Sequence, residues 1–366
     1  MDHTAAGKPP SVGVAHVLGL SANRSNFEKT LDGAGVVLPL TQRAEWHHAT
    51  GCRRGVLTVL CDDTRKPIAA VGVGVTSSRA VPGHWLYRVD RLSTTGCATT
   101  DATLIGDLTN LARRDWRCLR MTVELFERDH EARARMGQLL SGRGYSKRLP
   151  RSYTHTLALD LSPGSDALFS QLDAKVRRNV RAPAKRGLEI RAVTDVGLAH
   201  RLDALMTDTL GRAHAHPIHL PWDMIVRLSA QYPNRSRISG LFDPAVPGPE
   251  GLISFAWGAW HGSYATYEAG ASVRRPDLGR TPLAYALVWD LIAWASGTHA
   301  NWFDFGGVSV EPIRTPDDPF GGISEFKRYF CENTVDIGEA WVLEPRPVRA
   351  SIARAVSAVA RQLRAD

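Results

Sequence analysis

Two short segments near the end of the chain carry its most informative pattern: "NWFDFGG" at residues 301–307 and "GGISEFKRYF" at residues 321–330. The first has the aromatic content typical of a strand and ends on Asp304 followed by Phe-Gly-Gly. The second opens on two glycines and continues as a short helical run in which Phe326 precedes Lys327. Because glycine lets the backbone approach other groups closely, we expect a glycine-lined loop that holds a phenylalanine and a lysine beside a strand end.

The elements around these segments have counterparts earlier in the chain. Residues 53–77 read as two strands around a polar turn, followed by a third strand, a helix over 101–115, a strand, a helix closed by glycine and a further strand. The order strand, strand, strand, helix, strand, helix, strand returns about 185 residues later, although the two copies share almost no residues. The repeated pattern predicts two similar α/β units that arose by duplication.

The helix of the second copy has clear boundary signals. In "TPLAYALVWDLIAWASG", residues 281–297, we expect Thr281 as the N-cap, Pro282 in the first turn and Gly297 at the end. The run is apolar nearly all round, which predicts a buried helix.

Composition limits the class of protein. The chain has 366 residues, 43% hydrophobic and 22% charged, which fits two globular domains. No run of apolar residues reaches the length of a membrane span, and residues 1–25 lack the basic start of a secretory signal, so we expect a loose leader there. The number of cysteines is odd and none forms a Cys-x-x-Cys pair, which predicts a reducing, cytoplasmic setting without disulfides or a zinc site.

The formal net charge of +8 fits either a polyanionic partner or a solvated, arginine-rich surface. Lysines and arginines are densest in the segment between the two copies. This segment fits a helix face that binds phosphate and an exposed connecting helix equally well. These cations are Lys175, Arg177, Arg178, Arg181, Lys185 and Arg186. In the last twenty residues, an apolar helical face that includes Ile352 and Val356 predicts a helix that packs back on a domain, with Arg354 on its other face.

Three motifs in this order resemble the FemABX family, the aminoacyl-tRNA-dependent transferases that build peptidoglycan cross-bridges. The first is a basic helix with the spacing of Arg178, Arg181, Ala182 or Ala184, and Gly187; the other two are the Asp-Phe-Gly-Gly strand end and the later glycine with Phe-Lys. The resemblance covers residues 150–342, and the first half matches in pattern only. It implies tandem GNAT-like domains, mixed sheets flanked by helices, with the C-terminal helix packed on the first. We expect the first domain at residues 26–155 with the helix 346–366, and the second at 156–345.

The resemblance also implies a reaction and roles for residues. An aminoacyl group would pass from aminoacyl-tRNA, as co-substrate, to an amine of a small molecule or peptide precursor, with no metal and no other cofactor. Lys327 would stabilise the developing oxyanion, and Phe326 would stack on the terminal adenosine. The basic segment would guide the tRNA. The remaining candidates are Asp304 and Tyr267 as catalytic groups, and Phe305, Gly322, Arg212 and Glu268 as substrate contacts.

Each candidate has a structural alternative: core packing for Phe326, an exposed surface for Lys327, turn capping for Asp304, and ordinary strand positions for Tyr267 and Glu268. His214, His216 and His219 are close in sequence, but no cysteine or paired carboxylate supports a metal site there.

Two further functions stay open. An acyl-CoA-dependent N-acyltransferase would use the same fold, and residues 274–282 place arginines and a glycine before a helix N-terminus without the usual pyrophosphate-loop spacing. A tRNA- or RNA-binding protein without catalysis is the third possibility.

The chain departs from the cross-bridge enzymes in two respects. Those enzymes carry a lysine shortly after a tryptophan near the start, where it meets the acceptor's diphosphate, whereas Ala49 and Thr50 follow Trp46 here and only Arg53 or Arg54 is at hand. The charged coiled-coil arm of some members is also absent from the sequence pattern. Both departures weaken the case for a nucleotide-linked cell-wall precursor as acceptor and leave room for a small amine, as in relatives from antibiotic biosynthesis.

Overall fold

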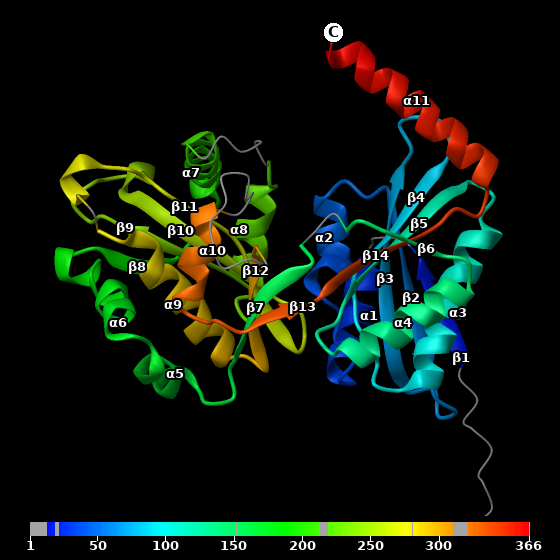
Figure 1. Ribbon diagram of the computed structural model, residues 1–366, viewed down its shortest axis with the longest axis horizontal. Coiled ribbons are helices and arrows are strands. Elements are labelled where there is room, and N and C mark those ends of the chain that lie inside the picture. The colour runs from blue at the N-terminus through cyan, green and yellow to red at the C-terminus, as the bar shows by residue number, and fades with distance from the viewer. Residues whose placement is uncertain are drawn as a thin grey trace, which may run out of the picture. The chain divides into compact units, whose positions relative to one another are not determined.

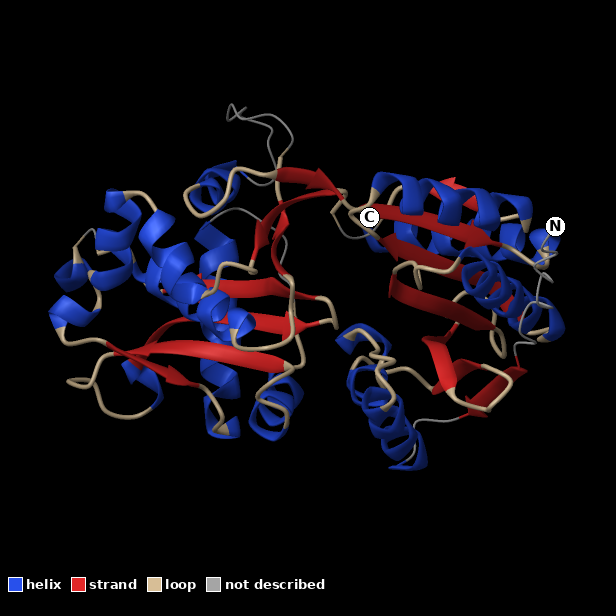
Figure 2. Ribbon diagram, turned by 90° about the horizontal axis from the view of Figure 1, so that it is seen from below, coloured by secondary structure: helices blue, strands red, loops and turns tan. Residues whose placement is uncertain are grey.

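The computed structural model describes residues 13–18, 22–150, 153–212, 219–279, 281–309 and 321–365. The chain forms two compact units (Figures 1 and 2). Unit 1 comprises Met1–Arg151 and Ile337–Asp366, and unit 2 comprises Ser152–Asp336. Each unit contains one mixed sheet of seven strands with helices packed on it, which confirms the predicted fold class.

The sheet of unit 1 has the order β1-β2-β3-β4-β5-β14-β6, in which only β4 and β5 run parallel. Its strands are β1 (Gly13–Leu18), β2 (Arg54–Cys61), β3 (Pro67–Ser77), β4 (Trp85–Leu92), β5 (Cys118–Phe126), β6 (Ser146–Arg148) and β14 (Gly338–Leu343). Its helices are α1 (Ala22–Gly33), α2 (Ala44–Ala49), α3 (Ala98–Arg114), α4 (His130–Gly142) and α11 (Pro347–Ala365).

Strand β2 shows how this sheet is buried on both faces. Val56 and Leu60 belong to the core under α3 and α4, whereas Leu57 and Val59 pack with Leu31 of α1 on the opposite face. Successive side chains of a strand point to opposite faces, so the continuous apolar run of β2 fits a sheet that has helices on both sides.

The sheet of unit 2 has the order β13-β7-β12-β11-β10-β9-β8, and again only one pair, β11 and β12, is parallel. Its strands are β7 (His155–Asp160), β8 (Glu189–Ala192), β9 (Ser236–Phe242), β10 (Leu252–Trp260), β11 (Tyr264–Ser272), β12 (Trp302–Gly307) and β13 (Thr334–Asp336). Its helices are α5 (Ser165–Gln171), α6 (Ala174–Arg181), α7 (Ala199–Arg212), α8 (Trp222–Gln231), α9 (Leu283–Ser296) and α10 (Gly321–Arg328).

Helix α9 is buried as its composition predicts, with Leu287, Leu291 and Ala295 fully enclosed, and it ends at Gly297. Its start differs from the prediction. The helix begins at Leu283, and the Thr281 hydroxyl donates a hydrogen bond back to the Leu278 carbonyl at 2.6 Å instead of capping the helix.

The repeat predicted from sequence is present: α3 begins at residue 98 and α9 at residue 283. The strand that follows each repeat, however, joins the other sheet. Strand β7, which follows β6 in the chain, lies between β12 and β13, and β14, which follows β13, lies between β5 and β6. The predicted boundary at residue 345 is therefore wrong, because the hydrogen bonds of Gly338–Leu343 go to β5 and β6 in unit 1.

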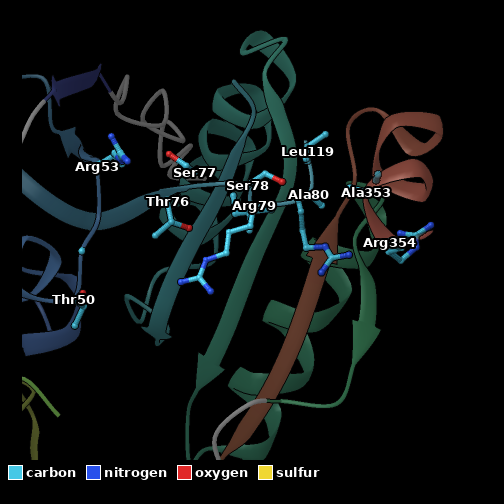
Figure 3. Close-up of a pocket in the computed structure, with 14 residues that line it drawn as sticks. Thr50, Arg53, Thr76, Ser77, Ser78, Arg79, Ala80, Leu119, Ala353 and Arg354 are labelled. Carbon is cyan, nitrogen blue, oxygen red and sulfur yellow. The ribbon is translucent and has the colours of Figure 1, made fainter. Parts of the chain in front are cut away.

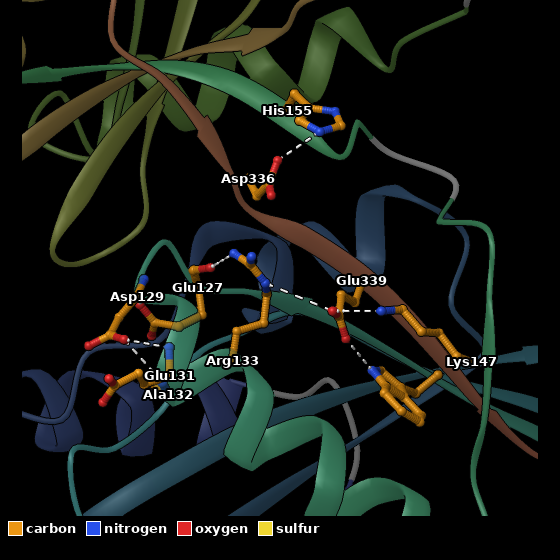
Figure 4. Close-up of polar contacts among 10 residues, drawn as sticks. Glu127, Asp129, Glu131, Ala132, Arg133, Lys147, His155, Asp336 and Glu339 are labelled. Atoms are coloured by element: carbon orange, nitrogen blue, oxygen red, sulfur yellow. Dashed lines mark hydrogen bonds and ion pairs between the residues drawn. The ribbon is translucent and has the colours of Figure 1, made fainter. Parts of the chain in front are cut away.

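Polar contacts hold the exchanged strands in their sheets (Figure 4). In unit 1, the Glu339 carboxylate of β14 accepts from Lys147 Nζ at 2.7 Å and lies 3.9 Å from Arg133 Nε. In unit 2, His155 Nε2 of β7 lies 2.7 Å from an Asp336 carboxylate oxygen of β13. Each pair joins the exchanged strand to an element of the unit that receives it.

One glycine of unit 1 is fixed by a close backbone approach. The amide of Gly72 in β3 donates to the Gln42 side chain, and a Cβ at Gly72 would lie 1.9 Å from the Gln42 carbonyl oxygen. That carbonyl also accepts from the fully buried Arg24 guanidinium at 2.8 Å. The turn at Leu40–Gln42 can therefore pack on β3 only where β3 has no side chain.

We expect Gly72→Ala to lower the free energy of unfolding by about 3 kcal/mol, because the new methyl group displaces backbone and not a flexible side chain. Gly142→Ala is the matched control, since nothing lies within 4 Å of its Cβ position and alanine favours the helix. Denaturant unfolding of the two variants checks this; equal stabilities would contradict the account of the turn.

Candidate active site in unit 2

The sheet of unit 2 divides between its two parallel strands. Strands β11 and β12 pair only from Tyr264 with Trp302 to Thr266 with Asp304, although β11 continues to Ser272. In unit 1 the corresponding strands β4 and β5 also shift register after Val89, but they pair again at Leu92 with Leu125. Beyond Asp304, β11 and β12 therefore form no ladder hydrogen bonds with each other. Backbone N–H and C=O groups along such an opening can hydrogen-bond a ligand.

A β-bulge lies on β11 at the same point. Trp257 of β10 pairs with Ala269 and the next residue, Gly258, pairs with Tyr267, so Glu268 is an extra residue in β11. Bulges change the direction of the side chains beside them. Tyr267 packs against the core of unit 2, and burial raises its pKa to about 12. Glu268 instead lies 3.1 Å from the buried His261 ring.

Asp304 occupies the last paired position of β12 and is fully buried. One carboxylate oxygen accepts from the Thr156 hydroxyl at 2.5 Å and the Gly306 amide at 2.8 Å; the other accepts from the Tyr153 hydroxyl at 2.5 Å and the Thr266 hydroxyl at 3.1 Å. Four donors satisfy a carboxylate that would otherwise be costly to bury. Asp304 thus joins β7, β11 and β12 at the point where the sheet divides.

Lys327 of α10 reaches the opening between the strands. Its side chain is 5% exposed, and its Nζ donates to the Gly307 carbonyl of β12 at 2.7 Å while lying 5.8 Å from the centre of the Tyr267 ring of β11. Gly306 has a φ of +73°, and a Cβ there would lie 3.1 Å from the Tyr267 carbonyl oxygen and 3.6 Å from Nζ. The positive φ and the close Tyr267 carbonyl therefore favour glycine at position 306, directly beside the ammonium group.

Burial lowers the pKa of Lys327 to about 8, and the carboxylate of Asp304 opposes part of this shift. The ammonium form still predominates at neutral pH. A cation in a site with little water interacts strongly with negative charge that develops beside it.

A cavity of about 540 Å³ lies on the same unit. Phe326 and Tyr285 line it, with their ring centres 4.9 Å apart in an edge-to-face arrangement. Arg212 and Arg274 also line it. Arg212 Nη2 donates to the Ser272 carbonyl at 2.6 Å, and its Nη1 pairs with Asp208. The structure thus brings Phe326 and Arg212, predicted from separate motifs, to one cavity.

Other predicted residues lie elsewhere. Phe305 has no exposed surface and packs between Phe303 and Phe330, so its ring belongs to the core. Gly322 is exposed in the first turn of α10, with nothing within 4 Å of its Cβ position. Glu268 pairs with His261 and not with Lys327.

The basic segment divides into exposed and structural cations. Arg177 is half-buried and donates to the carbonyls of Ser170 and Leu172, so it closes the end of α5. The buried Val176 fixes α6 on the unit. The other five cations are exposed: Lys175, Arg178, Arg181, Lys185 and Arg186.

Of the three histidines that are close in sequence, His214 and His216 lie outside the described residues. His219 is exposed and lies 3.9 Å from Asp203. Over the described ranges, no three His, Cys, Asp or Glu side chains come together in a way that could hold a metal ion. Over the same ranges, no helix has the length and apolar character needed to cross a membrane.

Unit 1 has different contacts in the turn before α3 and a different cavity. The turn before α3 is closed by Asp101, whose carboxylate accepts from the hydroxyls of Thr94 and Thr95 at 2.6 and 2.7 Å. A cavity of about 1090 Å³ lies where β4 and β5 begin, lined by hydroxyls and by arginines that include Arg53 and Arg79 (Figure 3). Arg54, by contrast, is engaged by Asp115 at 2.6 Å.

No protein-family model matches the chain, and no curated protein matches it. Among solved structures, FemX is similar with a TM-score of 0.69 at 15% identity, over 89% of this chain and 98% of FemX. L-PGS from Bacillus licheniformis is similar with a TM-score of 0.51 at 13% identity, over 92% of this chain and 98% of that one. A tandem GNAT protein from the clavulanic acid biosynthesis pathway is similar with a TM-score of 0.51 at 12% identity, over 92% of this chain and 99% of that one. The chain therefore has a FemX-like tandem GNAT fold.

Sequence reasoning missed the hydroxyl donors around Asp304, which are Tyr153, Thr156 and Thr266, and it missed Tyr285 beside Phe326. Thr156 is 148 residues from Asp304 in the chain, and no local pattern marks such a partner. Tyr285 lies within a helix recognised for its apolar character, so its role beside the cavity has no separate signal.

The pKa of Lys327 predicts a change of stability with pH. Its folded-state value of about 8 lies below the value of about 10.4 for an unfolded lysine, so the unfolded chain binds more protons between these pH values. We expect the free energy of unfolding of the wild type, relative to Lys327→Met, to rise by up to about 3 kcal/mol from pH 8 to 10.5. Lys185→Met supplies the control for loss of an exposed lysine. If the wild type instead loses stability relative to Lys327→Met as the pH rises, the buried ammonium group is contradicted.

Proposed function

We propose that this protein transfers an aminoacyl group from aminoacyl-tRNA to an amine and so forms an amide bond. The observation that carries the proposal is the Lys327 ammonium, buried at the opening between β11 and β12 and one residue from Phe326 of the aromatic cavity. The FemX-like fold supports it, because the chain aligns with nearly the whole of FemX.

The reaction needs one stabilised charge and one proton transfer. The acceptor amine attacks the ester carbonyl carbon, the carbonyl oxygen becomes an oxyanion, and the ester C–O bond then breaks. The ribose oxygen of the tRNA leaves with a proton that originates on the amine. Lys327 places its positive charge beside the oxyanion, where charge develops only during reaction.

The neighbouring residues have supporting roles in this proposal. Asp304 is a positioning residue, because its oxygens are occupied by four donors and it fixes the turn at Gly306. Tyr267 stays a neutral phenol, since burial raises its pKa to about 12, and it can relay the proton or support the ammonium with its ring.

The cavity suits the end of a tRNA. Phe326 and Tyr285 offer aromatic surface on which a terminal adenine can stack. Arg212 and Arg274 place guanidinium groups on the same cavity for the adjoining phosphates. The five exposed cations of the basic segment then provide a surface for the acceptor arm.

An acyl-CoA-dependent N-acyltransferase is the second candidate. The cavity is also lined by Arg274, Gly279 and Thr281, directly before the N-terminus of α9, where phosphate groups are favoured. The similarity to a tandem GNAT protein fits this donor as well.

We expect Lys327→Met to lower the rate of aminoacyl transfer by about a hundred- to a thousand-fold, the effect of removing one oxyanion donor. Binding of aminoacyl-tRNA is expected to change little, because the ammonium group stabilises the oxyanion, which is not yet present in the bound ester. Single-turnover transfer and filter binding measure the two effects separately. Unchanged transfer would remove Lys327 from the mechanism.

The salt dependence of tRNA binding tests the basic segment. The double variant Arg178→Ala with Lys185→Ala is expected to reduce the slope of log affinity against log salt by about 1 to 2. With two fewer phosphate contacts, tRNA binding releases fewer counterions. Arg227→Ala, an exposed arginine of α8, is the matched control and leaves the slope unchanged. An unchanged slope in the double variant would exclude this segment from the tRNA site.

A further inference from the structure

Helix α11 of unit 1 has one packed face and one exposed apolar face. Ala350 is 2% exposed and lies with Ala353 against the unit, beside the cavity at the start of β5. Val348, Ile352 and Val356 are 73%, 55% and 44% exposed, so the apolar face that was predicted to pack on a domain is the exposed one. Their spacing of four residues places them along one side of the helix, so they form an apolar stripe on α11 (Figure 1, red helix).

An exposed tryptophan lies beside the first turn of this helix. Trp116, in the turn between α3 and β5, is 55% exposed. Arg349 donates to the Trp116 carbonyl at 3.1 Å, and its guanidinium group lies 5.6 Å from the indole centre. Arg117 lies 5.0 Å from the same ring. Two arginines thus hold an aromatic side chain at the surface next to the apolar stripe.

Cationic side chains gather around this surface, where Arg117 and Arg349 lie against the Trp116 ring. Residues 347–365 contain four arginines and no aspartate or glutamate. The nearby carboxylates are already engaged: Asp115 pairs with Arg54, and Glu344 pairs with Arg120 and Arg354. The apolar stripe and Trp116 are therefore bordered by Arg117 and Arg349, whose contacts are with the Trp116 ring and its carbonyl.

We propose that the apolar stripe of α11 and Trp116 form a docking surface for an anionic lipid bilayer. A basic amphipathic helix lies in the plane of such a surface, with aliphatic side chains below the headgroups and arginines among the lipid phosphates. Tryptophan prefers the same interfacial depth. A second copy of this chain is a poorer occupant, because a symmetric pairing through this surface would bring the same arginines of both copies together. The inference does not depend on the transfer reaction.

The test uses the full chain and two kinds of vesicle, one of equal parts phosphatidylglycerol and phosphatidylcholine and one of phosphatidylcholine alone. We expect the protein to sediment with the anionic vesicles only and to be released by high salt. Val348→Ser with Ile352→Ser and Val356→Ser is expected to weaken this binding at least tenfold. Ile68→Ser, at an exposed isoleucine of β3 in the same unit, is the control and binds as the wild type does.

Two results would overturn the proposal. One is binding to anionic vesicles that is absent or that the triple variant retains in full. The other is a lipid-free dimer, seen by sedimentation equilibrium, that the triple variant abolishes, because the stripe would then belong to a second copy. The three side chains are exposed, so an unchanged unfolding transition shows that the variant is folded.

Discussion

The buried carboxylate of Asp304 determines where the second sheet divides, and the candidate site depends on that division. Its two oxygens accept from donors on β7 and β11, from Tyr153 and from the Gly306 amide. Strands β11 and β12 separate directly after it, and the positive φ of Gly306 follows. The Gly307 carbonyl is then in place to hold Lys327. A structural hydrogen-bond network and a candidate catalytic cation are thus parts of one arrangement.

The two units share a topology but not this arrangement. In unit 1, β4 and β5 pair again at Leu92 after a register shift, and Asp101 closes the turn before its equivalent helix. Unit 2 opens at the corresponding place and carries the lysine and the aromatic cavity. A single unit with an open sheet is enough for one reaction, and the other unit is free to take a different role, such as the docking surface proposed for α11.

Sequence patterns predicted the features that depend on neighbouring residues. The helix that ends at Gly297, the repeated order of elements and the pairing of Phe326 with Lys327 on one short helix could all be read locally. Features set by distant partners could not. The strand exchange of β7 and β14 leaves no local signal, so the domain boundary was misplaced. Likewise, Arg177 closes α5 and Phe305 fills the core, although both sit in motifs that suggest ligand contacts.

The identity of the donor tests the account most directly. The pure protein would be incubated with radiolabelled aminoacyl-tRNAs and a mixture of small amines, with and without ribonuclease, beside parallel reactions with labelled acetyl-CoA. The account predicts that label moves from tRNA into an amide product and that ribonuclease abolishes the transfer. Transfer from acetyl-CoA that survives ribonuclease, with none from aminoacyl-tRNA, would contradict it.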